Sequence, residues 1–190
     1  YFIIDRKKDI YKNSRGQTIA PQKIENLFQD FDSIKSIFLI GDGKEFNTVL
    51  IYPDHKNSPL DLKFQSDKTI RDFFSSIILS VNSFLAPFER IVNYVLIHRD
   101  FSKERGELTH KGTFIRTQVL KNFKKIIDPL YEKNYVSLYN NSKEVRIPNW
   151  LTREIGTVKN NISWDGKILT IKDQSKKMIL NWIDNNIQIG

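Results

Sequence analysis

The spacing of apolar residues predicts a short helix followed by a hairpin in the first third of the chain. Pro21 suits the first turn of a helix, and apolar side chains then recur three and four residues apart. These side chains are Ile24, Leu27, Phe28 and Phe31. Apolar runs over 34–40 and 46–52 flank a loop that contains Gly41 and Gly43, as a reversing chain requires. We therefore expect a β-hairpin against which the helix packs.

Two longer helices are predicted further along, with a strand between them. Residues 68–85 carry a wide apolar face at helical period, and residues 93–98 form a short strand-like run. The apolar face of the helix consists of Ile70, Phe73, Phe74, Ile77, Ile78, Val81, Phe84 and Leu85. A third helix is expected over about 114–131, with Ile115, Val119, Phe123, Ile126 and Leu130 inward. Residues 1–133 are therefore expected to form an α+β domain of small mixed sheets with helices packed on them.

The composition changes after Tyr131, where asparagine, tyrosine and serine interrupt the apolar pattern. We therefore treat residues 134–190 as a C-terminal extension, a small α/β subdomain of unknown role. It is predicted to contain a helix near 150–155, a strand over 167–172 and a closing helix. The closing helix would bury Met178, Ile179, Trp182 and Ile183. We expect the core of the extension to contain Trp150, Trp164 and Trp182.

Charge narrows the range of partners only slightly. The formal charge is +8, and residues 1–95 hold 13 basic and 12 acidic side chains, whereas residues 96–190 hold 17 and 10. A basic surface suits nucleic acid, anionic lipid or a phosphate-rich small molecule, and charge alone does not separate these. The sequence contains no RNA-binding signature and no zinc-finger spacing, so nucleic acid is not expected as a partner.

The absence of cysteine excludes disulfides, thiolate metal sites and cysteine nucleophiles from this sequence. The three histidines, His55, His98 and His110, are isolated from one another, so no metal site is expected. Because no apolar run approaches ~18 residues and no signal peptide is visible, we expect a cytoplasmic location, with peripheral contact at the inner membrane face left open. The chain starts inside an apolar run without methionine, and we expect a monomeric fragment of a longer protein.

The segment from Asp5 to Asn26 carries most of the functional information. It places four cations around a short hairpin, namely Arg6, Lys7, Lys8 and Lys12. This arrangement suits the phosphates of ATP or CoA, and Gly16 lets the backbone approach a ligand closely. A charged surface hairpin without a ligand would show the same residues, so the pattern by itself leaves both interpretations open.

This segment resembles the motif that opens the C-terminal lid domain of adenylate-forming acyl-CoA synthetases, and it is most similar to the long-chain fatty acid branch. The resemblance implies a two-domain enzyme that joins a carboxylate to AMP and then rotates its small domain for thioester formation. It places Lys8 at the hinge and Arg6 at the nucleotide. It assigns to the CoA channel the loop residues Lys12, Asn13, Ser14, Arg15 and Gly16. The family glycine is missing at Arg15, whereas Gly16 remains for the turn.

A second stretch, residues 101–116, resembles the family segment whose lysine contacts the substrate carboxylate and phosphate during adenylation. A gapless alignment on Arg116 puts Thr113 where the lysine is expected. The nearest cation is Lys111, which we expect to be the catalytic residue, with an ordinary surface lysine as the alternative. Glu107 and His110 are close in sequence, but this spacing fixes no acid–base geometry, so we expect a structural or incidental role for both.

By this resemblance the chain is identified as the mobile C-terminal domain of an ATP-dependent long-chain fatty acid CoA ligase. The whole enzyme would convert fatty acid, ATP and CoA to acyl-CoA, AMP and pyrophosphate, with Mg²⁺ accompanying ATP. Its partner would be its own N-terminal AMP-binding domain, and we expect the fragment alone to be inactive and to bind no cofactor. Two alternatives remain open: a lid that passes the acyl-adenylate to a carrier protein, and a non-catalytic ligand-sensing module suggested by Thr113.

Overall fold

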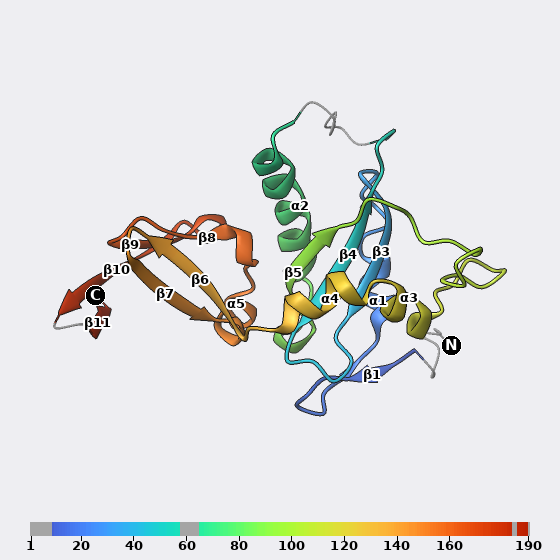
Figure 1. The fold of residues 1–190 in the computed structure, drawn as a ribbon, viewed down its shortest axis with the longest axis horizontal. Coiled ribbons are helices and arrows are strands. Elements are labelled where there is room, and N and C mark those ends of the chain that lie inside the picture. Colours follow the sequence, from blue (N-terminus) through green and yellow to red (C-terminus); the bar gives the residue numbers. More distant parts are fainter. Residues whose placement is uncertain (1–8, 58–64, 184–185, 190) are drawn as a thin grey trace. The chain divides into compact units, whose positions relative to one another are not determined.

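The computed structural model describes residues 9–57, 65–183 and 186–189 (Figure 1). The chain divides into two compact units, of which the first comprises residues 1–64 and 93–133 and the second comprises residues 65–92 and 134–190. Small sheets and helices occur in both units, which gives the expected α+β class. The second compact unit thus joins residues 65–92 to the C-terminal extension. The expected division of the chain into a domain over 1–133 and an extension over 134–190 stays a prediction.

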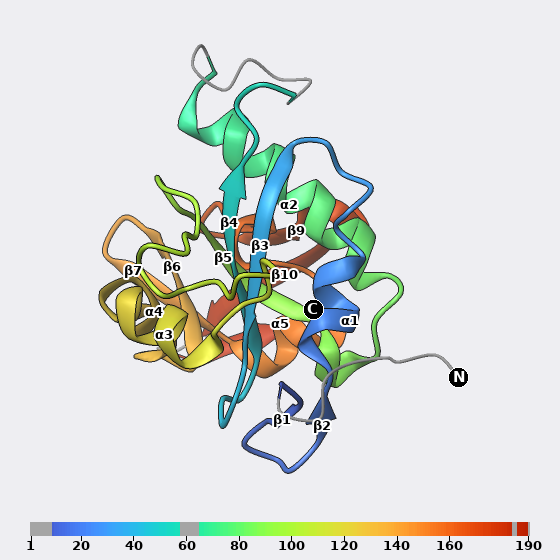
Figure 2. The ribbon, with the colours of Figure 1, turned by 90° about the vertical axis from the view of Figure 1, so that its right-hand side faces the viewer.

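The first unit contains a small hairpin, a short helix, a three-stranded sheet and a pair of helices. In chain order its elements are β1 (Tyr11–Lys12), β2 (Thr18–Ile19), α1 (Pro21–Asn26), β3 (Ile34–Ile40), β4 (Asn47–Pro53), β5 (Ile91–Leu96, whose first two residues belong to the second unit), α3 (Arg116–Asn122) and α4 (Lys124–Tyr131). The sheet has the order β3-β4-β5, and β3 pairs antiparallel with β4 so that Phe38 faces Leu50. Helix α1 packs against β3 (Figure 2).

The predicted helix after Pro21 and the predicted hairpin are confirmed, although the helix is shorter than its apolar pattern suggests. Pro21 occupies the first turn of α1, where its missing N–H has no intrahelical partner to lose. The helix ends at Asn26, and the chain continues in turns in which Phe31 N donates to Phe28 O at 3.2 Å. Ile24 and Phe28 are fully buried, so the apolar stripe reaches the core even where the chain is no longer helical.

The core of the first unit contains residues from the sheet, the loop after β5, and helices α3 and α4. Its buried members are Phe38, Ile40, Leu50, Ile97, Phe101, Val119, Phe123 and Ile127. The rings of Phe101 and Phe114 lie 5.0 Å apart in an edge-to-face arrangement, and Phe38 lies 5.1 Å from Phe114 in the same manner. These aromatic contacts attach the loop that precedes α3 to the sheet.

The prediction of a single helix over 114–131 is wrong, because the structure has two helices, α3 and α4, separated by a break at Phe123. Phe123 has φ −100° and ψ 10°, outside the helical range, and its side chain is buried in the core. On the second helix Ile127 is buried, whereas Ile126, predicted inward, is 38% exposed. Ile115, also predicted inward, precedes α3 and is likewise 38% exposed.

The second unit contains a long helix, a two-stranded hairpin and a four-stranded sheet. Its helices are α2 (Asp67–Asn82), α5 (Asn149–Ile155) and the 3-10 helices η1 (Pro87–Glu89), η2 (Lys159–Asn161) and η3 (Lys172–Gln174). Its strands are β6 (Tyr135–Asn140), β7 (Lys143–Pro148), β8 (Ile162–Trp164), β9 (Ile168–Ile171), β10 (Lys176–Ile183) and β11 (Asn186–Ile189). Strand β6 pairs with β7, and the larger sheet has the order β11-β10-β9-β8.

The predicted long helix is confirmed as α2, and Ser66 caps it by accepting a hydrogen bond from Thr69 N at 3.1 Å. Phe74 and Ile78 are fully buried on its apolar face. Phe84, predicted on the same face, lies beyond the helix end and is 79% exposed. None of the helices in the described part of the chain is long and apolar enough to cross a bilayer.

In the extension, the predicted helix and the predicted strand are confirmed as α5 and β9, but the predicted closing helix is wrong. Met178 and Ile179 lie in strand β10, which pairs antiparallel with β9. Leu180 is buried and Ile179 is not, an alternation with the period of two that a half-buried strand requires. Trp164 is buried as expected, whereas Trp150 is 47% exposed. The side chains of Trp182 and Ile183 lie outside the described residues.

Candidate functional site

The predicted CoA-channel loop is a turn organised by the side chain of Asn13. This side chain is 6% exposed, and its Oδ1 accepts hydrogen bonds from the N–H groups of Arg15 and Gln17 at 3.0 Å each. Its Nδ2 donates to Gln17 Oε1 at 2.9 Å. Gly16 has φ +79°, a conformation that favours glycine, so the turn depends on Gly16. Lys12, Ser14, Arg15 and Gly16 are exposed on this turn.

The turn is attached to the loop between β3 and β4. Ser14 N donates to Lys44 O at 2.9 Å, and Gly43 N donates to Lys12 O at 2.8 Å. The Arg15 guanidinium lies 3.8 Å from the Glu45 carboxylate. Backbone hydrogen bonds in both directions therefore fix the position of the two loops relative to each other.

A tyrosine and a glycine pack tightly beneath this attachment. Tyr11 OH donates to Asn47 Oδ1 at 3.1 Å, and burial raises the pKa of Tyr11 well above its usual value, so the phenol remains a donor. A Cβ atom at Gly41 would lie 2.0 Å from Asn47 Oδ1 and 2.6 Å from Tyr11 OH. Gly41 is therefore required by close packing.

Lys111 lies at the tip of a second hairpin, residues 107–115. Leu108 and Phe114 form a bridge, Thr109 N donates to Thr113 O at 2.9 Å, and Gly112 N donates to Thr109 O at 2.9 Å. Gly112 has φ +79°, as expected for the last residue of a three-residue hairpin loop. The side chain of Lys111 is exposed at this tip. We call the whole hairpin, residues 107–115, the lysine loop.

Thr113, which occupies the aligned lysine position, has its hydroxyl engaged inside the lysine loop. Its Oγ1 lies 2.7 Å from Thr109 Oγ1, and its backbone N–H donates to Thr109 Oγ1 at 3.2 Å. Thr113 therefore contributes to the hairpin itself, while the cation two residues earlier points into solvent.

Glu107 is fully buried where the lysine loop leaves the core. Arg99 donates to both of its carboxylate oxygens, at 2.6 and 2.9 Å, and Asn122 Nδ2 and Ser102 N donate at 2.8 and 3.0 Å. Burial raises the pKa of Glu107, but the hydrogen bonds from Arg99, Asn122 and Ser102 outweigh it and leave the pKa below its usual value. This set of bonds agrees with the structural role expected for Glu107, and His110 is exposed.

The other strand of the lysine loop leads directly into a second buried ion pair. Arg116 Nη1 donates to Glu25 Oε1 at 3.0 Å, and Arg116 Nη2 donates to the backbone oxygen of Leu39. The same Glu25 oxygen accepts a hydrogen bond from Leu39 N at 2.7 Å. The Arg116 guanidinium carbon also lies 4.2 Å from the centre of the Phe38 ring. The start of α3 is thereby joined to α1 and β3.

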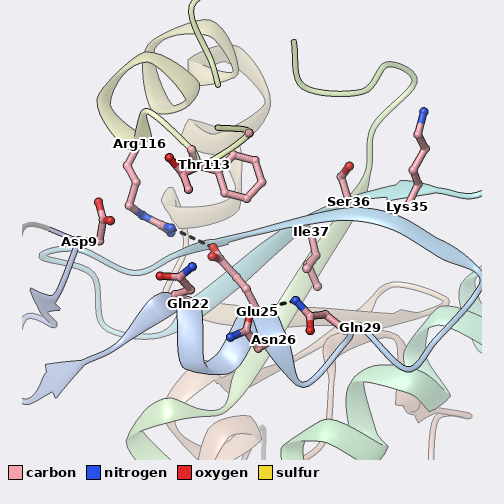
Figure 3. A pocket seen from close by; sticks show the side chains of 12 residues that line it. Asp9, Gln22, Glu25, Asn26, Gln29, Lys35, Ser36, Ile37, Thr113 and Arg116 are labelled. Atoms are coloured by element: carbon pink, nitrogen blue, oxygen red, sulfur yellow. Dashed lines mark hydrogen bonds and ion pairs between the residues drawn. The ribbon is translucent and has the colours of Figure 1, made fainter. Parts of the chain in front are cut away.

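A hollow of about 350 Å³ opens beside this ion pair (Figure 3). Gln22 and Asn26 of α1 line one part of it together with Gln29 from the turn after α1, and residues 112–114 of the lysine loop line another. Figure 3 shows Arg116 reaching toward Glu25 between these two parts. The polar lining is suited to a hydrogen-bonding ligand or to a polar segment of another domain.

A second hollow, of about 520 Å³, lies between the β3–β4 loop and the helix pair. Lys44, Lys121 and Lys124 line it together with apolar residues of α3 and α4 that include Leu120 and Ile127. Residues 12–16 line neither of these two hollows. The turn is bonded to the β3–β4 loop, whereas the ends of the lysine loop are bonded to Arg99, Asn122 and Glu25, so the two predicted functional segments are supported by different parts of the first unit. Arg6 and Lys8 lie outside the described residues, so their roles stay predictions.

Sequence reasoning missed the supporting pairs Arg99–Glu107 and Arg116–Glu25. The sequence does show that these two charged residues stand next to apolar ones. Glu25 follows the core residue Ile24 in a short helix, and Arg116 follows an apolar pair at the start of α3. Charges at such positions are rarely buried unless they are paired. The partners themselves, 91 residues apart in one case, are not readable from the sequence.

The comparisons with known proteins agree with this architecture. The family described as "AMP-binding enzyme C-terminal domain" matches residues 8–135. Long-chain-fatty-acid–CoA ligase 6 of Mus musculus is 34% identical over 145 residues, which cover 68% of this chain and 20% of that protein. Long-chain-fatty-acid–CoA ligase 1 of Homo sapiens is 30% identical over 142 residues, with the same two coverages. The chain spans about a fifth of the length of these relatives.

Two solved structures show the same fold. The adenylation domain of a carboxylate reductase from Mycobacterium chelonae matches with a TM-score of 0.60 at 18% identity, over 68% of this chain and 20% of that one. The adenylation domain of a carboxylic acid reductase from Segniliparus rugosus matches with a TM-score of 0.56 at 20% identity, over 67% of this chain and 20% of that one. Because the family match covers more than half of the sequence, the chain belongs to the family of AMP-binding enzyme C-terminal domains.

Proposed function

We propose that this chain is the mobile C-terminal domain of an ATP-dependent long-chain fatty acid CoA ligase. The family match over residues 8–135 and the identity to long-chain ligases support this assignment. The observation that carries it is the presence, on one compact unit, of two separately built segments that present cations, namely the lysine loop and the turn at residues 12–16. Two separate segments suit an enzyme whose small domain serves two successive reactions.

In the first reaction, a fatty acid carboxylate attacks the α-phosphorus of ATP, and pyrophosphate leaves. Negative charge develops between the carboxylate oxygen and the α-phosphate, and a cation placed there stabilises the transition state more than the ground state. We assign this role to Lys111, which is exposed at its hairpin tip. Thr113 is a weaker candidate, because its hydroxyl is neutral and bonds to Thr109, and charge-assisted hydrogen bonds are about twice as strong as neutral ones.

In the second reaction, the thiol of CoA attacks the acyl-adenylate carbonyl and AMP leaves. We assign the turn at residues 12–16 to the channel for CoA, where Lys12 and Arg15 present charge and Gly16 keeps the backbone accessible. Arg6 is assigned to the nucleotide and Lys8 to the hinge, both from the resemblance alone. ATP enters as its Mg²⁺ complex, and both substrates depend on the N-terminal domain, so the isolated chain is inactive. The location that accompanies this proposal is cytoplasmic.

The test is to assay the full-length protein that contains this chain for its two half-reactions. The proposal predicts ATP–pyrophosphate exchange that depends on a long-chain fatty acid, followed by thioester formation with CoA. Transfer of the acyl group to a carrier protein, with no transfer to CoA, would replace this function by the carrier-dependent alternative. Binding of ATP and fatty acid without any exchange would show a non-catalytic module.

A further inference from the structure

Both strands of the lysine loop enter the core at an ion pair whose carboxylate is buried, Arg99–Glu107 at one end and Arg116–Glu25 at the other. The first strand begins at Glu107, and the second strand leads into Arg116. Each residue stands at one end of the loop, Glu107 four residues before Lys111 and Arg116 five residues after it. This arrangement is the starting point for an inference that rests on the proposed function.

At the first end, the Glu107 carboxylate receives four hydrogen bonds. Arg99 supplies two of them from the loop after β5, Asn122 supplies one from the end of α3, and the Ser102 amide supplies one. The backbone oxygen of Glu107 accepts a hydrogen bond from Ile115 N at 2.8 Å, which closes the base of the hairpin. One residue therefore joins the two strands of the loop to each other and to two further segments.

At the second end, Arg116 connects three parts of the unit. It donates to Glu25 on α1 and to the backbone of Leu39 on β3, and its guanidinium lies over the Phe38 ring. A further contact reaches closer to the tip, because Lys103 Nζ donates to His110 O at 2.9 Å. The loop is therefore held at both ends and beside its tip.

Burying a carboxylate is unfavourable, and pairing it with an arginine seldom adds net stability over an apolar contact of the same size. Two such pairs at one loop need another reason than stability. Charged pairs with several hydrogen bonds are more directional than apolar contacts, so they restrict direction and register where an apolar contact would allow movement. Here the two ion pairs fix the direction of the lysine loop.

We infer that Glu107 and Arg116 are positioning residues for Lys111 in the adenylation step. They touch no substrate and act by holding the lysine loop in one orientation relative to β3 and α3. A displacement of about 1 Å at a reacting group can lower a rate by about 100-fold. We therefore expect Glu107→Gln to lower the rate of ATP–pyrophosphate exchange by about 10- to 100-fold at saturating substrates, with little change in the KM for ATP.

The test is a double-mutant cycle in the full-length enzyme, with Glu107→Gln made alone and together with Lys111→Ala. If Glu107 acts through Lys111, it has no further effect on exchange once Lys111 is removed. Thioester formation from preformed acyl-adenylate should be unchanged in Glu107→Gln, because that step is assigned to the turn at residues 12–16. A residue that only supports folding would lower both half-reactions by the same factor in both backgrounds.

The matched control is Glu144→Gln, which removes a carboxylate bonded to Arg146 and Ser137 on the β6–β7 hairpin and should leave exchange unchanged. If Glu107→Gln does not fold, Arg99→Lys keeps the positive charge, loses the two-point contact, and should show the same selective loss. Unchanged exchange in a folded variant, or an equal loss in the Lys111→Ala background, overturns the inference alone. Absence of exchange in the wild-type enzyme overturns the proposed function and the inference with it.

Discussion

The turn at residues 12–16 makes a prediction that can be quantified, because a single side chain organises it. Replacing Asn13 with alanine removes the acceptor for two backbone N–H groups, those of Arg15 and Gln17. It also removes the donor to Gln17 Oε1. The backbone hydrogen bond from Asn13 N to Gln17 O, at 3.0 Å, remains after the substitution. The variant should therefore loosen the turn without unfolding the unit.

The magnitude follows from the hydrogen bonds lost. Each intramolecular hydrogen bond contributes about 0.5 to 1.5 kcal/mol net, and a buried donor left unpaired costs more. Arg15 and Gln17 are exposed, so water reaches their N–H groups and the lower part of this range applies. We expect Asn13→Ala to lower the free energy of unfolding by about 1 to 2 kcal/mol, which corresponds to about 2 to 8 °C in midpoint for a chain of this length.

Two assays test this prediction. Thermal unfolding of the isolated chain, followed by circular dichroism, measures the stability change. In the full-length enzyme, thioester formation from preformed acyl-adenylate should fall by about 10-fold while ATP–pyrophosphate exchange changes little. Asn13→Asp is the matched variant, because it keeps the acceptor for both N–H groups and should retain most of the stability and the rate. Equal loss in Asn13→Ala and Asn13→Asp, or loss of exchange in place of thioester formation, would refute the reasoning.

Three further changes test other parts of the structure. Hydrogen bonds, first from Arg146 and then from Ser137, lower the pKa of Glu144 to about 2. The stabilising effect of the Glu144 carboxylate is therefore fully present above about pH 4.5 and is lost as the pH falls through about 2. The difference in stability between the wild type and Glu144→Gln, measured by denaturant unfolding, should shrink toward acid pH. Gly41→Ala should destabilise the chain by about 1 to 3 kcal/mol in the same assay, because its Cβ would lie 2.0 Å from an oxygen of Asn47. Truncation after residue 133 removes the carbonyl groups that Arg90 binds in α5 and should lower the unfolding midpoint by several degrees; an unchanged midpoint would make the extension an independent unit.

The elements that the sequence predicts well are those in which one apolar pattern covers the whole element. The strands β3 and β4 are nearly continuous apolar runs around a loop with two glycines, and α2 has a long apolar face. The pattern fails where tertiary packing decides between alternatives. At Phe123 the helical period continues in the sequence, but burial of the ring accompanies a break in the helix. Residues 176–183 are compatible with both periods, and they form a strand because their first half pairs with β9 and their second half with β11.

The candidate site could be predicted only in part. Glycines at 16 and 112 and the nearby cations indicate where the two turns lie, and both glycines have positive φ. The sequence does not reveal that Asn13 organises the first turn, because its acceptor role depends on the local backbone path. Nor does it reveal that Glu107 bonds to Arg99 and Asn122, since that requires two loops and a helix end to meet.

The measurement that tests the account most directly compares Lys111→Ala with Thr113→Ala in the full-length enzyme, with the two half-reactions followed separately. The account predicts that Lys111→Ala lowers ATP–pyrophosphate exchange by about 100-fold or more and leaves thioester formation from preformed acyl-adenylate intact. Thr113→Ala should change either step little, because its hydroxyl bonds within the loop. Exchange that survives Lys111→Ala would contradict the account, since the lysine loop would then supply no charge to adenylation.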